Sequence, residues 1–159
     1  MSHKMLSRIL FAAGIIAFAG GAAVFFLYAP LLANECRIMY PELAHLALPA
    51  LLYIWCIALL YIHALFLYMR ISLRLGKNRS FCLKNANALR HIALLLVIAS
   101  VLWFALIFLP GIMGISIGPA FLLFLLASMA TSAVAMVSYV LSLLVRRATA
   151  LQDENDLTI

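Results

Sequence analysis

Four long apolar segments follow one another along the chain and are separated by short polar stretches. They cover approximately residues 9–32, 46–71, 90–109 and 119–145. A helix crosses the ~30 Å hydrocarbon core of a bilayer with about 20 apolar residues, because each residue adds ~1.5 Å. Each segment is long enough for one crossing. The pattern predicts an all-α polytopic membrane protein with a bundle of four transmembrane helices.

The composition agrees with the pattern. Hydrophobic residues make up 68% of the 159 residues and charged residues only 10%, whereas a soluble domain has about 25% charged residues. Outside the apolar segments no stretch is long enough to hold a core of its own. We therefore expect residues 1–159 to form a single integral membrane domain.

The distribution of Lys and Arg predicts the orientation of the chain. Short loops rich in these residues stay on the cytoplasmic side. Ten of the eleven basic residues precede the first segment, lie at or between the second and third, or follow the fourth, and only Arg37 lies elsewhere. Both termini are expected in the cytoplasm. The basic face would attract anionic lipid, and no direct nucleic-acid binding is expected.

The apolar segments contain little that carries chemistry. No Asp, Glu, Lys or Arg lies deep in any of them, and His63 is the one histidine well inside. An ionisable group there is a functional candidate by default, but a lone histidine more often hydrogen-bonds a neighbouring helix. A haem would need a second histidine at similar depth, and His91 lies about two turns nearer the cytoplasmic end. We expect no catalytic residue, cofactor or metal.

Two further patterns suggest helix packing and interfacial anchoring. Small residues recur at four-residue spacing in the first and fourth segments: Ala13, Ala17 and Gly21, then Ala127, Thr131 and Ala135, with Ser128 and Ser132 beside them. Such ridges let helix backbones approach each other in lipid. Aromatic residues near the segment ends suit the membrane interface: Tyr28, Tyr40, Tyr53, Trp55 and Tyr68.

Residues 70–91 are predicted to form a basic helical hairpin on the cytoplasmic side. Gly76 suits a helix end and Ser80 a helix start. At 100° per residue, one face of the second helix collects Phe81, Asn85, Ala88, Leu89 and Ile92, and the opposite face collects Lys84, Asn87, Arg90 and His91. Asn85 is the polar exception on the apolar face. It is expected to hydrogen-bond a neighbouring helix end or to cap a loop.

The chain ends in an acidic tail, residues 148–159, that closes with "LQDENDLTI". This closing stretch holds Asp153, Glu154 and Asp156, three of the five acidic residues. No helix breaker separates it from the fourth span, so the helix should continue into the tail. The acids would then lie level with the basic hairpin. The tail either docks on Arg70, Arg74, Lys77 or Arg79, or frays into solvent as chain ends commonly do.

The closing "LQDENDLTI", preceded by "RR", and the upstream spacing of Phe81, Asn85, Leu89, Arg90 and Ile92 resemble a known family. It is the YoaS-like family of small bacterial four-span membrane proteins, a domain of unknown function. The glycine common after the basic pair is replaced here by Ala148 and Thr149. Members are often encoded beside a small helix-turn-helix regulator. The resemblance implies a membrane component of a regulatory pair in the bacterial cytoplasmic (inner) membrane.

These observations favour a non-enzymatic sensory or tethering protein that works with a cytoplasmic helix-turn-helix transcriptional regulator. The residues expected to bind the partner are Arg74, Lys77, Arg79, Phe81, Asn85, Arg90, Asp153, Glu154 and Asp156. A small-solute transporter is the alternative, with Ser100, Ser128, Thr131, Ser132, Ser138 and His63 as its available lining. A membrane redox or haem protein ranks third. The sequence leaves open whether the chain forms a homo-oligomer.

Overall fold

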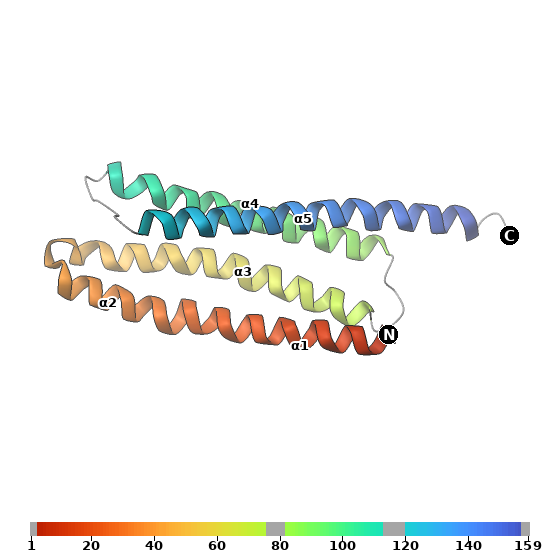
Figure 1. Ribbon diagram of the computed structural model, residues 1–159, viewed down its shortest axis with the longest axis horizontal. Helices are drawn as coiled ribbons and strands as arrows, with labels where there is room; N and C mark the ends of the chain where they lie inside the picture. The colour runs from red at the N-terminus through yellow and green to blue at the C-terminus, as the bar shows by residue number, and fades with distance from the viewer. Residues whose placement is uncertain (1–2, 76–81, 113–119, 157–159) are drawn as a thin grey trace.

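The computed structural model is entirely helical in the part of the chain that it describes (Figure 1). It describes residues 3–75, 82–112 and 120–156, and the side chains of residues 5–75, 82–108 and 120–152. The elements in chain order are α1 (His3–Ala22), the π-helix η1 (Ala23–Tyr28), α2 (Ala29–Met39), the 3₁₀-helix η2 (Pro41–Leu46), α3 (Ala47–Leu75), α4 (Leu83–Ile112) and α5 (Ala120–Asp156).

Four helical stretches are long and apolar enough to cross a membrane. They are Met5–Met39, Pro41–Leu75, Leu83–Phe108 and Ala120–Gln152. The prediction of an all-α chain with four such helices is therefore confirmed. With 37 residues, α5 is about 55 Å long, well beyond the ~30 Å of the hydrocarbon core. Its last turns extend past the start of α4 (Figure 1).

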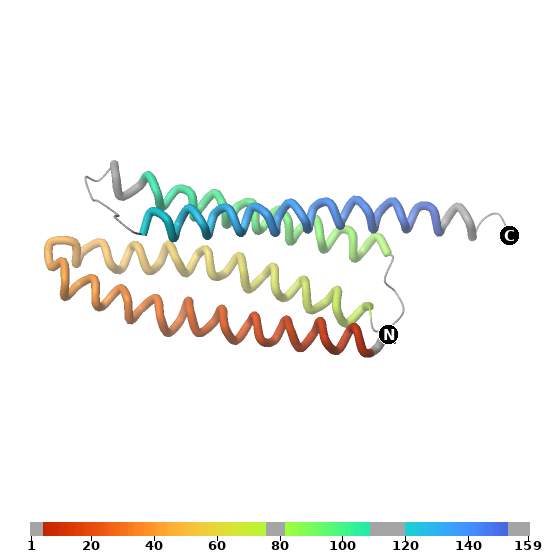
Figure 2. The backbone as a smooth tube through the Cα atoms, viewed as in Figure 1, coloured from red at the N-terminus to blue at the C-terminus, as the bar shows by residue number. Residues whose placement is uncertain are grey.

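The helices form an open row. Contacts join α1 to α3, α3 to α4, and α4 to α5. Within the described residues, no Cα atom of α1 comes within 8 Å of α4 or α5, and none of α3 comes that close to α5. The backbone tube shows α4 and α5 together above α3 and α1 (Figure 2). The expected bundle is thus not closed, and each helix keeps a broad face free of other helices.

The α4–α5 interface is built from small side chains at seven-residue intervals. On α4 they are Ala86, Ala93 and Ser100, and on α5 they are Ser128, Ala135 and Ser142, all buried. The Ser128 hydroxyl donates to the Ser100 carbonyl at 3.0 Å, which sets the antiparallel register. Small residues let the two backbones approach closely where lipid supplies no hydrophobic drive. The expected ridge in the fourth span is confirmed at Ser128, Thr131 and Ala135, but Ser132 is exposed.

In the first span the predicted ridge is wrong. Ala13 and Ala17 are exposed, and the buried small residue is Gly14. A Cβ atom at Gly14 would lie 3.2 Å from Cε1 of Tyr68 and 3.3 Å from Cγ of Met69. Because α1 packs on α3 alone, only one of its faces is buried, and its rotation brings Gly14 to that face. Four-residue spacing does not specify this rotation.

Reciprocal hydrogen bonds hold the basic ends of α1 and α3 together. The Ser7 hydroxyl donates to the Ser72 carbonyl at 2.7 Å, and the Ser72 hydroxyl donates to the Ser7 carbonyl at 3.0 Å. One turn further along, the Tyr68 hydroxyl donates to the Leu10 carbonyl at 3.2 Å. Both serines are buried. Helix carbonyls accept a second hydrogen bond through their other lone pair, so these contacts need no break in either helix.

A chain of hydrogen bonds links three helices through Tyr61. The indole Nε1–H of Trp103 on α4 donates to the Tyr61 oxygen at 3.1 Å, and this oxygen lies 2.5 Å from Oγ1 of Thr131 on α5. The Thr131 hydroxyl donates to the Ala127 carbonyl at 2.7 Å. Since that proton is committed, Tyr61 must donate to Thr131. Tyr61 thus joins α3 to α5, although the two backbones do not meet.

The π-turn η1 follows from Pro30. Proline has no N–H, and its ring clashes with the carbonyl four residues earlier in a regular helix. Here the Ala29 N–H donates to the Val24 carbonyl, five residues back. The Phe25 carbonyl then lacks a backbone donor, because the residue five positions on is Pro30. Trp55 on α3 supplies the missing donor, since its Nε1–H lies 3.1 Å from that carbonyl oxygen.

This arrangement predicts that Trp55 and Pro30 are energetically coupled. In Trp55→Phe the Phe25 carbonyl loses its donor, and an unsatisfied buried polar group costs about 1–3 kcal/mol. In Pro30→Ala the new N–H can reach the carbonyl instead. We expect Trp55→Phe to lower the free energy of unfolding in detergent by at least ~1 kcal/mol more in the native background than in Pro30→Ala. Equal losses of unfolding free energy in the two backgrounds would contradict the role of Trp55 as the donor that replaces the missing N–H of Pro30.

The close approach of α1 and α3 gives a second prediction. Gly14→Leu should lower the melting temperature in detergent, because overpacking a tight contact costs about 1–3 kcal/mol. Gly20→Leu is the matched control, since a Cβ atom there meets nothing within 4 Å. The control should melt at or above the native temperature, because replacing glycine favours the helix. A Gly14→Leu protein that melts like the control would show that α1 is not held against α3 at this point.

Candidate functional site

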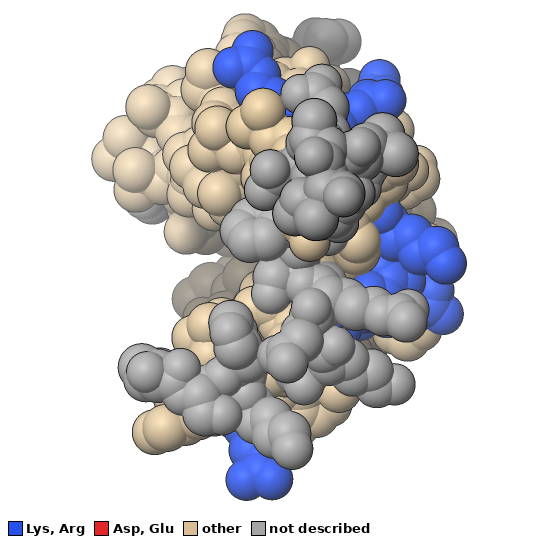
Figure 3. Space-filling model, turned by 90° about the vertical axis from the view of Figure 1, so that its right-hand side faces the viewer, with Lys and Arg blue, Asp and Glu red and all other residues tan. Residues whose placement is uncertain are grey.

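Basic side chains gather at one end of the helices. The described ones are Arg8 on α1, Arg70 and Arg74 on α3, Lys84 and Arg90 on α4, and Arg146 and Arg147 on α5. Viewed onto this end, they lie at its upper, right and lower edges, and no described acidic side chain lies among them (Figure 3). The acidic residues with described side chains, Glu35 and Glu42, lie in α2 and η2 at the opposite end. This basic end is the main electrostatic feature of the described chain.

The start of α4 has the two faces that the sequence predicted. Asn85 is only 1% exposed, and Ala88 and Ile92 are also buried, whereas Lys84 and Arg90 are exposed. The Arg74 guanidinium donates to Oδ1 of Asn85 at 3.4 Å. Asn85 therefore hydrogen-bonds the end of the neighbouring helix α3, as expected. This contact ties the end of α3 to the start of α4.

A first basic groove lies between α3 and α4. Its cavity is about 220 Å³ and is lined by Leu67, Arg70, Arg74, Lys84, Asn87, Ala88 and His91. The Arg70 guanidinium also lies 4.5 Å from the centre of the Phe66 ring, a cation–π distance that helps to hold it on α3. Three permanent cations around one cavity favour an anionic group, such as a carboxylate or a phosphate.

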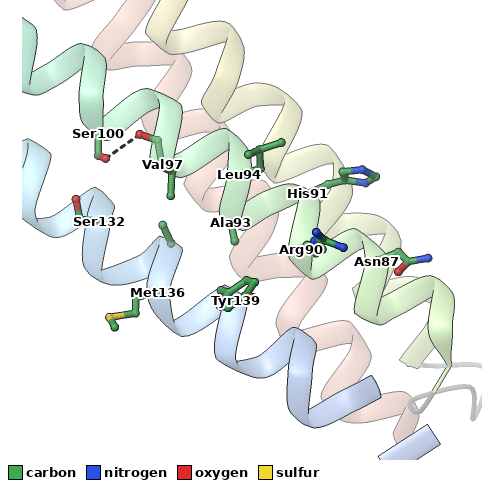
Figure 4. Close-up of a pocket in the computed structure, with 11 residues that line it drawn as sticks. Asn87, Arg90, His91, Ala93, Leu94, Val97, Ser100, Ser132, Met136 and Tyr139 are labelled. Atoms are coloured by element: carbon green, nitrogen blue, oxygen red, sulfur yellow. Dashed lines mark hydrogen bonds between the residues drawn. The ribbon is translucent and has the colours of Figure 1, made fainter. Parts of the chain in front are cut away.

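A second groove lies on the other side of α4, against α5 (Figure 4). Its cavity is about 810 Å³. Asn87, Arg90 and His91 stand at one end, and Ser100 and Ser132 stand at the other (Figure 4). Leu94, Val97, Met136 and Tyr139 form the walls between them. A smaller cavity of about 150 Å³ adjoins the basic end, where Arg146 joins Arg90 and Tyr139.

The structure brings together some of the predicted partner-binding residues and separates others. Arg74 and Asn85 touch, but Arg90 lines the cavities between α4 and α5. Lys77, Arg79 and Phe81 lie outside the described residues, as do the side chains of Asp153, Glu154 and Asp156. Docking of the tail on the hairpin therefore stays a prediction, because the acidic side chains of the tail are not among those described.

Sequence reasoning missed Tyr139 and the pairing of Arg146 with Arg90. Both cations were visible in the sequence, and Arg90 was already placed on the polar face of its helix. The missing information was the register between α4 and α5, which brings two residues 56 positions apart to one cavity. The seven-residue repeat of small residues on both helices was the signal that gives this register.

The polar residues deeper in the spans are engaged with helix carbonyls. The hydroxyls of Ser100, Thr131 and Ser138 donate to Val97, Ala127 and Val134 at 2.7–2.8 Å. His63 is exposed on α3 and lines none of the cavities above. Among the described residues, no group of three or more His, Cys, Asp or Glu lies together as metal ligands would.

Comparison with known proteins gives one match. Searches of curated proteins and of solved structures found nothing similar. The family model described as "Protein of unknown function (DUF2975)" matches residues 31–159. This region contains α3, α4 and α5 and therefore both basic grooves. The chain belongs to the DUF2975 family of proteins of unknown function.

Proposed function

We propose that this chain is a non-enzymatic sensory or tethering protein of the bacterial inner membrane that works with a cytoplasmic helix-turn-helix regulator. Within the DUF2975 family we place it among YoaS-like members, on the resemblance of its closing segment. The observation that carries the proposal is the basic end of the helices (Figure 3). By the positive-inside rule this end faces the cytoplasm, where a soluble regulator would meet it.

The geometry of α5 supports a role for the acidic tail. The helix continues without a break from the membrane-spanning stretch to Asp156, and it passes the start of α4 (Figure 1). It therefore carries the positions of Asp153, Glu154 and Asp156 outward as a helix. A DNA-binding regulator has a basic surface for phosphates, and an acidic helix suits that surface.

The groove between α3 and α4 would compete with the regulator for the same acidic tail. Arg70, Arg74 and Lys84 line it, and they would attract the acids of the tail when no regulator is bound. Each exposed ion pair contributes only about 0–1 kcal/mol. The free energies of the two states, with the tail held in the groove or released from it, would therefore differ little. A small signal in the membrane spans can shift such an equilibrium.

Small-solute transport is the alternative function, and the 810 Å³ cavity between α4 and α5 is the observation that favours it. Three hydroxyls of the expected lining, those of Ser100, Thr131 and Ser138, donate to carbonyls of their own helix. Only Ser100 and Ser132 of that lining face the large cavity. This favours the tethering role over a polar path across the membrane.

The orientation can be tested with single cysteines. Cys36 is exposed on α2 and should react with a membrane-impermeant maleimide added to intact spheroplasts. In a second variant that lacks the native cysteines, Arg147→Cys at the basic end should react only after the membrane is opened. The opposite labelling pattern would reverse the orientation and remove the cytoplasmic partner from the proposal.

The partner can be tested by co-expression with the helix-turn-helix regulator that the family resemblance implies. The intact chain should retain the regulator in the membrane fraction. The triple change Asp153→Asn, Glu154→Gln and Asp156→Asn should release most of it, because the tail loses its charge. Retention should also fall as salt is raised, since the Debye length is about 8 Å at physiological ionic strength.

Charge neutralisation at the other end is the matched control. Glu35→Gln with Glu42→Gln removes acidic residues from α2 and η2 and should leave retention unchanged. Full retention by the neutralised tail would rule out the acidic-tail mechanism. If no regulator is retained by any variant and a solute flux appears in proteoliposomes, the transport function replaces the tether.

A further inference from the structure

We propose that the groove between α4 and α5 binds one anionic phospholipid. Its phosphate lies between Arg90 and Arg146, and one acyl chain follows the groove toward Ser100. This inference does not rest on the proposed regulator, because it concerns the groove that α4 forms with α5, which Arg70, Arg74 and Lys84 do not line. It rests on the charges, the shape and the length of the groove.

Two arginines from different helices line one small cavity. Arg90 of α4 and Arg146 of α5 both line the 150 Å³ space, together with Asn87 and Tyr139, and no acidic residue lines it. Within the described part of the chain, neither arginine forms an ion pair or a side-chain hydrogen bond. Two like charges gathered around one cavity favour an anion between them. Arginine binds phosphate oxygens in pairs through its planar fork of N–H groups.

The cavity has room and further donors for a phosphate. Its 150 Å³ corresponds to the share of about five water molecules in liquid water. Asn87 and Tyr139 also line it, and their side chains carry an amide and a phenol that can donate hydrogen bonds to an anion. The Ser142 hydroxyl is not among them, because it donates to the Tyr139 carbonyl at 2.7 Å. The donor set is thus two cations, one amide and one phenol.

Beyond Tyr139 the groove becomes apolar. Leu94, Val97 and Met136 line it and expose 58%, 49% and 72% of their surface. The buried alanines Ala93 and Ala135 form part of its lining. Because these side chains are small, the helices meet closely there and the larger side chains stand apart on either side. An extended hydrocarbon chain fits between such walls.

The length of the groove matches one leaflet. From Arg90 to Ser100 the helix rises about 15 Å over ten residues, which is half of the ~30 Å hydrocarbon core. A phosphate held at Arg90 would therefore place the end of its acyl chain near Ser100 at mid-membrane. Basic pockets between transmembrane helices are known to take anionic headgroups. A free phosphate would fill only the small cavity and leave the apolar walls uncovered, so we favour the lipid.

The test is native mass spectrometry of the detergent-purified chain with phosphatidylglycerol, phosphatidylcholine or inorganic phosphate. We expect one phosphatidylglycerol to be retained with at least tenfold higher apparent affinity than phosphatidylcholine. Arg90→Gln and Arg146→Gln should each lower that affinity about tenfold. Arg147→Gln is the matched control, because Arg147 is the neighbouring cation on α5 and lines none of the cavities described; it should change the affinity less than twofold.

The acyl-chain half of the site has its own variant. Ser132 is exposed and lines the deep part of the groove, so Ser132→Phe should displace the chain and weaken lipid retention while both arginines remain. A melting curve checks that each variant is folded. Equal effects of Arg146→Gln and Arg147→Gln would show general surface attraction and overturn the site. Full competition by millimolar inorganic phosphate, or unchanged retention in Ser132→Phe, would overturn the lipid as its occupant.

Discussion

The fold depends on one constraint, which is that polar groups surrounded by lipid must find partners inside the protein. Lipid tails are as apolar as leucine and give no hydrophobic drive for the helices to associate. Pro30 shows the effect most directly. It deprives the Phe25 carbonyl of a backbone donor, and Trp55 from the next helix supplies one. A proline in one helix thus fixes the position of a tryptophan in another.

The same constraint explains how an open row of helices stays together. Hydrogen bonds from Tyr68 and the serine pair hold α1 to α3, and the Tyr53 hydroxyl reaches the Leu102 carbonyl of α4 at 2.8 Å. Tyr61 reaches α5, which is too distant for backbone contact. Hydrogen bonds from the long aromatic side chains of α3 therefore help to connect helices that direct helix contact would hold together in a closed bundle. Several of these aromatic residues were predicted to be interfacial anchors. The sequence shows that they lie near the ends of the spans, but it does not show which carbonyl on another helix accepts their hydrogen bond.

Local patterns predicted more of this protein than long-range ones. The four spans and the buried face of α4 follow from the period of apolar residues, which is a property of a single helix. Asn85 was recognised because it breaks that period. The rotation that buries Gly14 instead of Ala13, and the register that joins Arg90 to Arg146, are properties of helix pairs. Several rotations satisfy the spacing of small residues in α1, so the sequence of that helix alone does not select one.

The two basic grooves share lining residues, which provides a physical mechanism for the proposed sensory role. Asn87 and His91 line both the α3–α4 cavity and the large α4–α5 cavity. An anion bound in one groove lowers the positive potential in the other, because the two cavities meet at Asn87 and His91 and charges are screened less through protein than through solvent. A lipid at Arg90 and Arg146 would then weaken the hold of Arg74 and Lys84 on an acidic segment. By linkage, the acidic segment would weaken lipid binding by the same factor. On these two proposals, the lipid composition of the membrane would be a signal that this arrangement of charges passes to a partner at the basic end.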